Sequence, residues 1–319
     1  MRFNSTLSLA MLASATAAQL TTQLFNFTSS INIENSQLRP NGHLLLTTFY
    51  QAQLYTINPQ ARNPKAELVA SLPGATALTG IAPVGHDKYA VVGGVRGSYH
   101  YDNETIYTVD FSKNSTNPTI KIVAYVPDAD MLNGMASMPS QPHILLIADA
   151  RLGSIFRVDT TTGASKVVLK DDALAAPANA SIPIGINGLQ VVGNNVYFTN
   201  SALNIFARVP VSKDGQTFGS IEVIASLERE ADDTLSDWDD FAIDANGDVY
   251  LALPPNSISK IAPDGTQSVV AGGGDSLAFI GPTSVQIAQG GKVAYVTTRG
   301  GSESGVAYGG QVVALKLRE

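Results

Sequence analysis

The sequence predicts an all-β fold, namely a six-bladed β-propeller whose N-terminal strand closes the last blade. Three observations support this prediction. A unit of short β-runs recurs six times, Gly-containing turns separate these runs, and no stretch shows sustained helical periodicity. An array of β-sandwiches is the alternative, and it explains the six phased units less well.

Each unit begins with a short apolar strand, continues through a turn into a strong β-run, and ends in a further strand near Asp or Pro. Asn133 and Asn187 begin the third and fourth units and lie 54 residues apart, while Asp239 of the fifth unit lies 52 residues beyond Asn187. Such a spacing, with four short strands per unit, is typical of propeller blades. The six units begin at residues 34–36, 79–82, 132–135, 186–189, 238–242 and 281–285.

The ends of the chain indicate how the ring closes. Units one to five are each followed by a fourth strand, for example at residues 165–169 and 267–270, but unit six ends at Glu319 after its third strand. The segment Thr22–Phe27 can supply the missing outer strand. Both chain ends would then share one blade and leave no open sheet edge.

The N-terminus has the pattern of a secretory signal peptide. A positive start at Arg2 precedes an uncharged apolar run over residues 7–17, and Ala15, Ala17 and Ala18 supply small residues for cleavage. The run is too short to span a bilayer. A buried N-terminal helix is the alternative, but polar residues follow at once. We therefore expect a signal peptide over residues 1–18, a single propeller domain over residues 19–319, no membrane partner, and a secreted or vesicular protein.

Glycosylation sequons and the cysteine count agree with this route. Four Asn-x-Ser/Thr sequons in the predicted mature chain predict exposed, glycosylated loops, and the chain contains no cysteine, so stability must come from a large core. The predicted glycosylation sites are Asn26, Asn103, Asn114 and Asn179.

Charge and composition narrow the class of partner. The formal net charge is −7 and the pI is about 5.1, and no basic stripe with interleaved aromatic residues occurs. Nucleic acid is therefore excluded as a partner, whereas a metal cation or a small organic ligand is compatible with the composition.

The first strand of each blade lines the channel of a propeller, so equivalent positions in the six units should converge at its mouth. Glu, Asn and Asp supply the oxygen ligands that a hard cation such as Ca²⁺ requires. Each residue taken singly has a plainer interpretation, because Asn133 and Asn187 precede Gly as turn residues do and Glu34 can be a solvated charge. The six positions are Glu34, Gly80, Asn133, Asn187, Asp239 and Thr283.

The phased pattern resembles the senescence-marker-protein and gluconolactonase-like family of six-bladed propellers over the whole mature chain. That resemblance implies a divalent metal held by Glu34, Asn187 and Asp239, with Asn133 as an accessory ligand, and a lactonase or esterase activity. The family's Glu-Gly-Pro is Glu34-Asn35-Ser36 here, and its Asp-Gly is Asp239-Asp240.

Further motifs are similar to a fungal secreted branch of these propellers that includes hetero-Diels–Alderases of tropolone–sesquiterpenoid biosynthesis. This resemblance implies a dehydration to a quinone methide and a cycloaddition with a sesquiterpene alkene, with a natural-product intermediate as the partner and no required cofactor. The shared motifs start at Asn41-Gly42, Leu132-Asn133-Gly134, Gly185-Ile186-Asn187, Asp239-Asp240-Phe241, Gly281-Pro282 and Val296-Thr297.

Such a reaction needs an apolar pocket and one acid or base. Asp239, Asp240 and Glu34 are the candidate proton shuttles, and adjacent acids raise one pKa where both point inward. Aromatic side chains can form the walls, although blade packing explains each of them singly. The candidate substrate-binding residues are Trp238, Asn133, Asn187, Thr283, Tyr50 and Phe279, with Phe49 and Tyr99 as further wall residues.

Three functions from different classes therefore remain: a pericyclase of secondary metabolism, a metal-dependent lactonase or esterase, and a non-catalytic secreted binding propeller. Four histidines and no cysteine give little support to a His-rich zinc site or a thiol nucleophile. No Gly-x-Ser-x-Gly followed by a helix occurs, which argues against a Ser-His-Asp hydrolase.

Overall fold

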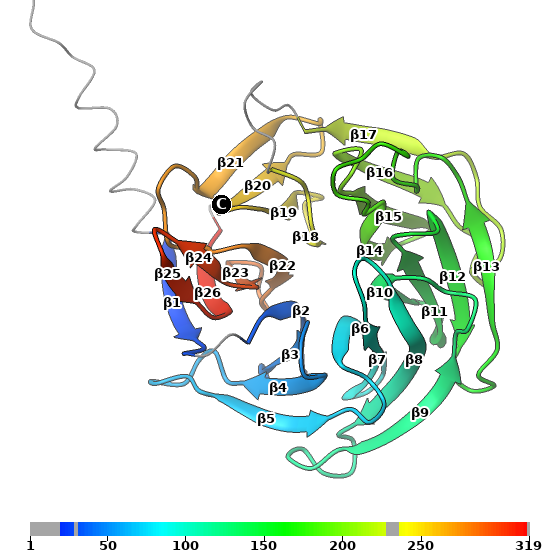
Figure 1. The fold of residues 1–319 in the computed structure, drawn as a ribbon, viewed down its shortest axis with the longest axis horizontal. Helices are drawn as coiled ribbons and strands as arrows, with labels where there is room; N and C mark the ends of the chain where they lie inside the picture. The colour runs from blue at the N-terminus through cyan, green and yellow to red at the C-terminus, as the bar shows by residue number, and fades with distance from the viewer. Residues whose placement is uncertain (1–19, 29–30, 228–235, 318–319) are drawn as a thin grey trace, which may run out of the picture.

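The predicted propeller is confirmed. The computed structural model describes residues 20–28, 31–227 and 236–317, and the regular elements of these ranges are all strands. Six four-stranded sheets lie in a ring, with the first strand of each sheet nearest the central axis (Figure 1). Residues 1–18, predicted as a signal peptide, lie outside the described ranges. Within those ranges, no helix is long and apolar enough to cross a membrane.

Every blade is an antiparallel meander that runs outward from the channel. Blade one contains β2 (Ile33–Leu38), β3 (Leu44–Thr48), β4 (Gln53–Ile57) and β5 (Ala66–Ser71). Blade two contains β6 (Ala77–Gly85), β7 (Lys88–Arg96), β8 (Tyr101–Asp110) and β9 (Thr119–Tyr125). Blade three contains β10 (Leu132–Met138), β11 (Gln141–Asp149), β12 (Ser154–Asp159) and β13 (Ser165–Lys170).

The second half of the chain repeats this order. Blade four contains β14 (Ile186–Val192), β15 (Asn195–Asn200), β16 (Ile205–Pro210) and β17 (Glu222–Ser226). Blade five contains β18 (Phe241–Ile243), β19 (Val249–Leu253), β20 (Ser257–Ile261) and β21 (Gln267–Gly272). Blade six contains β22 (Pro282–Ile287), β23 (Val293–Thr298), β26 (Gln311–Lys316) and β1 (Thr21–Asn26).

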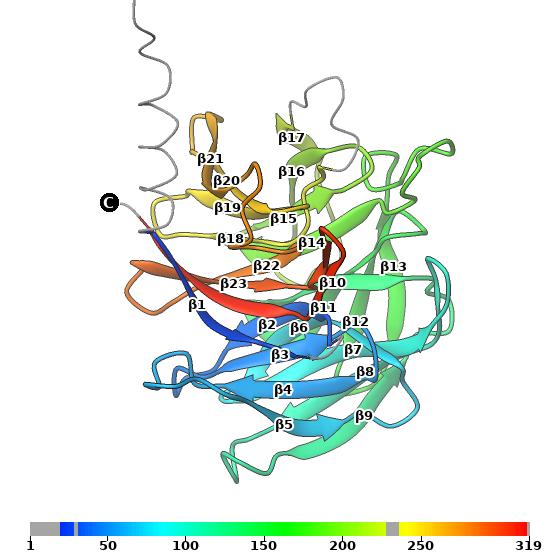
Figure 2. The same ribbon diagram turned by 60° about the vertical axis from the view of Figure 1, so that its left-hand side comes forward.

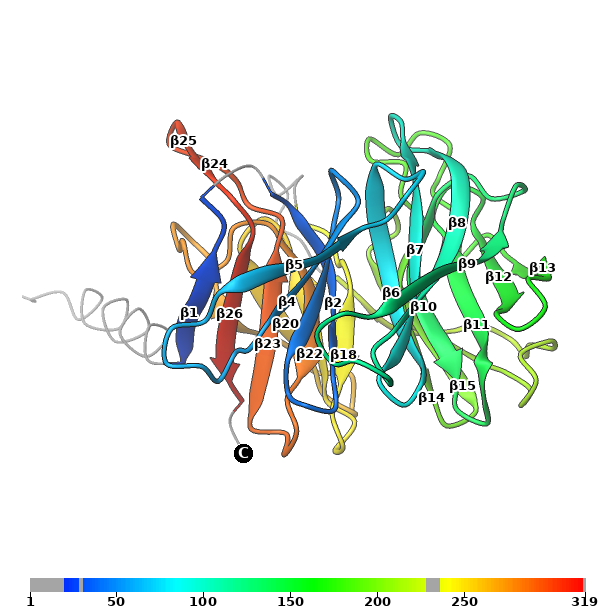
Figure 3. The same cartoon turned by 90° about the horizontal axis from the view of Figure 1, so that it is seen from below.

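A separate hairpin, β24 (Gly301–Glu303) and β25 (Val306–Tyr308), connects the second and third strands of blade six. Figure 3 shows this hairpin projecting beyond the ring on one face.

The N-terminal strand closes the last blade, as the sequence predicted. Strand β1 pairs antiparallel with β26, and Thr21 lies opposite Leu315 at one end of the pair (Figure 2). The side-chain amide of Gln311 donates to Gln23 Oε1 at 2.8 Å. The sheet edge that β26 would otherwise expose is therefore covered by the beginning of the chain.

The hydrophobic core lies between adjacent blades. Six buried clusters fill the six spaces between neighbouring blades, so each sheet packs on both of its faces. The strands of the second position in each blade are the most apolar because they are buried on both faces, as in β3, β11 and β19. Sheet-on-sheet packing thus explains stability without disulfides.

A shared irregularity of the first strands shapes the mouth of the channel. In blades one to four, the register of the first strand shifts over a two-residue bulge. In blade five, Asp239-Asp240 occupies the same place. The Asp239 amide donates to the Ala252 carbonyl at 3.0 Å, and the Ala252 amide donates to the Asp240 carbonyl at 3.0 Å. Bulges re-aim side chains, and in blades one, three and four they turn the first residue of the pair toward the mouth, whereas Thr79 of blade two is buried and its hydroxyl donates to the Leu132 carbonyl. The bulges are Glu34-Asn35, Thr79-Gly80, Asn133-Gly134 and Asn187-Gly188.

The glycines of these bulges are required by the close approach of neighbouring blades. A Cβ on Gly188 would lie 2.6 Å from Asp240 Oδ1, and one on Gly80 or Gly134 would collide with the carbonyl of the Asn that begins the next bulge. The Asn-Gly pairs at 133 and 187 therefore lie inside strands rather than in hairpin turns. Thr79, rather than the expected Gly80, holds the first bulge position of blade two.

Candidate active site at the channel mouth

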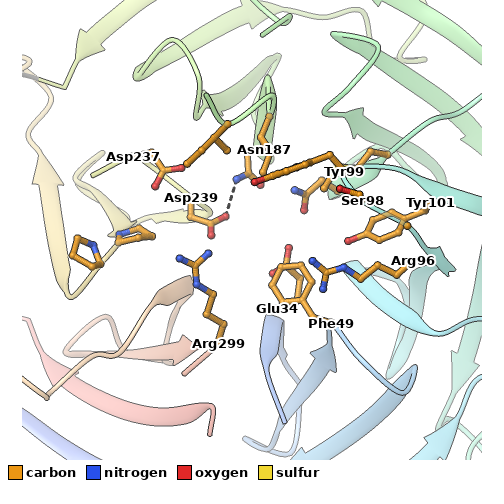
Figure 4. Close-up of a pocket in the computed structure, with 17 residues that line it drawn as sticks. Glu34, Phe49, Arg96, Ser98, Tyr99, Tyr101, Asn187, Asp237, Asp239 and Arg299 are labelled. Carbon is orange, nitrogen blue, oxygen red and sulfur yellow. Dashed lines mark hydrogen bonds between the residues drawn. The ribbon is translucent and has the colours of Figure 1, made fainter. Parts of the chain in front are cut away.

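A cavity of about 480 Å³ opens at one mouth of the channel. Its lining combines carboxyl and amide groups with two arginines and a wall of apolar and aromatic side chains (Figure 4). The apolar wall consists of Phe49, Tyr99, Tyr101, Met131, Ile182, Ile184, Pro254 and Pro255. Such a mixture is typical of a site for a small organic molecule.

Four residues predicted from the sequence lie together in this cavity. Glu34, Asn133, Asn187 and Asp239 are contributed by blades one, three, four and five. Their shared position is the first residue of the bulge, which explains why residues so distant in the chain converge. The Asn187 amide donates to Asp239 Oδ1 at 2.9 Å and to Ser201 Oγ at 3.0 Å, which fixes the two side chains relative to each other.

Glu34 is a buried acid with only 4% of its surface exposed, and its Oε2 has no hydrogen-bond partner among the described residues. Burial raises the pKa of the Glu34 carboxyl well above its ordinary value, and the charges of Asp239 and Asp240 raise it further. The positive charges of Arg299 and Arg96 act in the opposite direction. The protonated acid therefore persists to higher pH than in an exposed glutamate.

Asp239 has a similarly perturbed carboxyl. Burial raises its pKa well above the ordinary value, and the neighbouring charges of Asp237 and Asp240 add to this shift. The Arg299 charge and the hydrogen bond from Asn187 lower it. Two nearby acids that disfavour ionisation of each other lose their protons in separate steps, so over a range of pH the pair holds one acid and one carboxylate.

Asp240, predicted as a third proton shuttle, is buried and does not belong to the lining of the cavity. The Asp240 carboxyl is buried and accepts hydrogen bonds from the Asn35 side chain at 2.6 Å and from the Phe241 amide at 2.7 Å. Burial raises its pKa to about 6. These contacts give Asp240 a structural position outside the lining.

Trp238 does not line the cavity. It is fully buried between blades four and five, and its Nε1 donates to Ser259 Oγ at 2.9 Å. Successive side chains of an extended segment point to opposite sides, so Trp238 faces the core because Asp239 faces the cavity.

Three further predicted substrate-binding residues also lie outside the lining. Phe279 is fully buried between blades five and six, and Thr283 is buried with its hydroxyl donating to the Ile33 carbonyl at 3.1 Å. Tyr50 is 49% exposed and stacks on Arg96 outside the cavity. The aromatic residues that do form the wall include Phe49 and Tyr99.

Arg96, Tyr101, Asp237 and Arg299 line the cavity, but sequence reasoning assigned them no role. Arg96 and Tyr101 flank the loop between the second and third strands of blade two, and Arg299 follows the second strand of blade six. The Arg299-Gly300-Gly301 motif was visible in the sequence. Nothing in the repeat pattern phases such loop positions, so no signal there predicted that they meet the bulge residues.

The residues named for a divalent cation can be tested against this geometry. Glu34, Asn187 and Asp239 share the cavity, but the Asn187 amide turns its NH₂ group toward the Asp239 carboxylate. Among the described residues, no group of three or more His, Cys, Asp or Glu is placed to hold a metal ion. Glu34 and Asp239 would therefore be the only two acidic ligands of the predicted set, with Asn187 as an amide ligand, and the cation remains a prediction.

The four predicted glycosylation sites are exposed in the described structure. Asn26 lies in β1, Asn103 in β8, and the other two in connecting loops. Exposure is what a glycan requires, and the modification itself remains a prediction. The four are Asn26, Asn103, Asn114 and Asn179.

Comparison with known proteins identifies relatives over most of the chain, although no family model matches it. A protein from Phoma sp named "Putative hetero-Diels-Alderase" is 28% identical over 281 residues, which cover 79% of this chain and 78% of the relative. A protein of the same description from Sarocladium schorii is 28% identical over 295 residues, covering 82% and 73% respectively. The resemblance inferred from the motifs is confirmed at this level.

Solved structures with the same fold include a luciferin-regenerating enzyme with a TM-score of 0.66 and 14% identity, covering 93% of this chain and 95% of that one. Regucalcin from Agrobacterium tumefaciens, a calcium-binding protein, has a TM-score of 0.60 and 16% identity, with coverage of 92% and 93%. A gluconolactonase from Xanthomonas campestris has a TM-score of 0.60 and 11% identity, with coverage of 96% and 93%. At these identities the likeness establishes the fold alone.

Proposed function

We propose that this protein is a hetero-Diels–Alderase of secondary metabolism, which dehydrates an alcohol precursor to a quinone methide and directs its cycloaddition with a sesquiterpene alkene. The observation that supports this proposal most is that Glu34 and Asp239, two acids of raised pKa, line the same cavity of about 480 Å³. The two relatives of the same description support the reaction class.

The dehydration step needs an acid and a base on the same substrate. The protonated member of the pair donates its proton to the leaving hydroxyl, the C–O bond breaks, and water departs. The ionised member accepts the proton of the ring hydroxyl, whose electrons form the exocyclic double bond and the ring carbonyl. The products are one neutral quinone methide and one water. Two acids whose pKa values are pushed apart suit this division of roles.

The cycloaddition needs position rather than further proton transfer. The carbonyl oxygen and exocyclic carbon of the quinone methide form one C–O and one C–C bond with the two alkene carbons. Phe49, Tyr99 and the apolar residues Met131, Ile182 and Ile184 line the cavity that would hold both partners. Holding two reactants in a near-attack pose can contribute roughly 7–11 kcal/mol in the best intramolecular cases.

The test is product formation by purified protein from an ortho-hydroxybenzylic alcohol and a sesquiterpene, followed by chiral chromatography with mass detection. Catalysis predicts one enantiomer in excess, because the uncatalysed reaction gives a racemate. Glu34→Gln and Asp239→Asn should each lower the dehydration rate by roughly 100-fold or more, as expected for loss of a general acid or base. Glu222→Gln is the matched control, because Glu222 is exposed on blade four.

Three outcomes would contradict the proposal. A racemic product at the background rate would remove catalysis altogether, as expected of a non-catalytic binding propeller. Unchanged rates in the double variant Glu34→Gln with Asp239→Asn would remove the acid–base role. Calcium-dependent hydrolysis of a lactone, lost on chelation and without cycloadduct formation, would favour the lactonase instead.

A further inference from the structure

Two hydrogen-bond donors at the end of one hairpin face the cavity on the side away from Asp239. Arg96 and Tyr101 are direct partners across the β7–β8 pair, and both line the cavity (Figure 4). Side chains opposite each other on antiparallel strands lie on the same face of the sheet. The hairpin therefore presents a guanidinium and a phenol together.

The Tyr101 hydroxyl is buried without a protein partner. Tyr101 is 4% exposed, its OH makes no hydrogen bond to any described residue, and Figure 4 shows its ring aimed into the cavity. Buried polar groups in folded proteins are almost always hydrogen-bonded. An unpartnered donor that faces a cavity therefore indicates where a ligand acceptor binds.

Arg96 is held in place by aromatic rings. Its Cζ lies 5.1 Å from the ring centroid of Phe49 and 4.5 Å from that of Tyr50, and its backbone amide donates to Thr76 Oγ1 at 2.8 Å. Stacking on ring faces orients the guanidinium plane and leaves its N–H edge for a ligand.

The charge balance differs between the two arginines of the cavity. The positive charge of Arg299 lowers the pKa values of Asp239 and Glu34, and a further acid, Asp237, lies in the same lining. Within the described ranges, neither arginine forms an ion pair within 4.0 Å, and the positive charge of Arg96 lowers the pKa values of Glu34 and Tyr101. A protonated Glu34 is itself a donor, so this side of the cavity offers donors and positive charge with few acceptors.

We propose that Arg96 and Tyr101 form an oxyanion-binding subsite, which takes the carboxylate, enolate or phenolate oxygen of a planar ligand. The subsite deepens the proposed function, on which it rests for its role in catalysis, because it would bind the ring oxygen that gains negative charge as the substrate ionises. The guanidinium supplies a charge-assisted bond, and the phenol supplies a second one in a site largely shielded from water.

The experiment measures binding without turnover, using benzoate as the probe and benzamide as its uncharged counterpart, by isothermal titration calorimetry of the full-length protein. Benzoate should bind more tightly than benzamide. Arg96→Gln and Tyr101→Phe should each weaken benzoate binding by about 10-fold or more, the range for a hydrogen bond to a charged group. Arg96→Lys should recover only part of the loss, because lysine keeps the charge but not the planar fork.

Arg62→Gln and Tyr125→Phe are the matched controls, because both residues are exposed outside the cavity. They should leave the benzoate affinity unchanged. Circular dichroism and the unfolding temperature of each variant show whether a loss reflects misfolding. A loss in Tyr101→Phe at an unchanged unfolding temperature supports the subsite.

The proposal is overturned if the wild type binds benzoate no better than benzamide, or if Arg299→Gln abolishes benzoate binding while Arg96→Gln does not. These outcomes are separable from failure of the proposed function. Benzoate binding through Arg96 in a protein that forms no cycloadduct would leave the subsite standing and refute the pericyclase. Enantioselective cycloaddition that is unaffected by Arg96→Gln and Tyr101→Phe would support the pericyclase and refute the role of the subsite in it.

Discussion

The side-chain amide of Asn35 donates a hydrogen bond to the Asp240 carboxylate over 2.6 Å, and this bond joins blade one to blade five. These blades are not neighbours, because blade six lies between them (Figure 1). The Asp240 amide also donates to the Thr283 carbonyl of blade six at 3.1 Å. One acidic residue, next in sequence to Asp239, therefore joins three blades.

The ionisation of Asp240 should make stability depend on pH. Burial raises its pKa from 3.8 to about 6 on folding, so its stabilising contribution is complete below pH 3.8 and is lost as the pH rises through about 6. Relative to Asp240→Asn, the wild type should lose about 2 kcal/mol of unfolding free energy between pH 4 and pH 7. Urea unfolding across this range measures the difference, and parallel pH curves for the two proteins would contradict it.

A double variant in which Asn35 and Asp240 exchange their side chains is the control for the hydrogen bond between them. Asp240→Asn alone places two amides against each other, whereas Asn35→Asp combined with it restores a donor and an acceptor in reversed order. The double variant should be more stable than the sum of the two single effects predicts, which a double-mutant cycle measures.

Gly188 should tolerate no side chain. A Cβ there would lie 2.6 Å from Asp240 Oδ1 and 2.8 Å from Asp240 Cα, so blades four and five would have to move apart. We expect Gly188→Ala to cost about 1–3 kcal/mol in thermal or urea unfolding. Gly85→Ala is the matched control, because the nearest contact of its added Cβ is 3.8 Å away. Equal stabilities of the two variants would show that the close approach has no energetic consequence.

The charges around Asp239 should move its pKa in opposite directions. Asp237 raises the pKa of Asp239, so Asp237→Asn should lower it. Arg299 lowers that pKa, so Arg299→Gln should raise it. Carbon-detected NMR titration of the side-chain carboxyls in the free protein gives both values. Shifts of the same sign would refute the electrostatic arrangement described for the cavity.

Removal of β1 should open the ring. Deletion through residue 28 exposes the edge of β26 and removes the Gln23 contact with Gln311. The protein should then unfold at a lower temperature and aggregate through the open edge, as light scattering and calorimetry would detect. Deletion of residues 1–18 alone is the control and should preserve the fold. A monomeric protein of unchanged unfolding temperature after the longer deletion would contradict the role of the closure.

The ring and part of the site were accessible from the sequence because both follow the repeat. Glu34, Asn133, Asn187 and Asp239 occupy one phased position, so counting units was enough to bring them together. Trp238 was misplaced because adjacency in sequence does not tell which side of an extended segment faces the cavity. The Asn-Gly pairs suggested hairpin turns, but both pairs lie inside strands. Their glycines, Gly134 and Gly188, allow the next blade to approach closely.

Arg96, Tyr101 and Arg299 could not be placed from the sequence for a different reason. They lie at strand ends or in connections whose length and direction vary between blades, as the hairpin of β24 and β25 in blade six illustrates. Connections of this kind carry much of the functional variation of a fold, and no period marks them. The repeat pattern alone therefore does not place the cavity residues that lie in these connections.

The pairing of β1 with β26 also sets an order of events during synthesis. Thr21 must wait until Leu315 has been synthesised, whereas the strands of the first five blades pair with near neighbours in the chain. The entropy of closing so long a loop grows only slowly with its length, so the delay has a small effect on equilibrium stability. The delay affects the folding rate instead, because contacts between residues far apart in the sequence form late. Until β26 is available, blade six lacks its last two strands and leaves a sheet edge open, and such exposed edges make folding intermediates prone to aggregation.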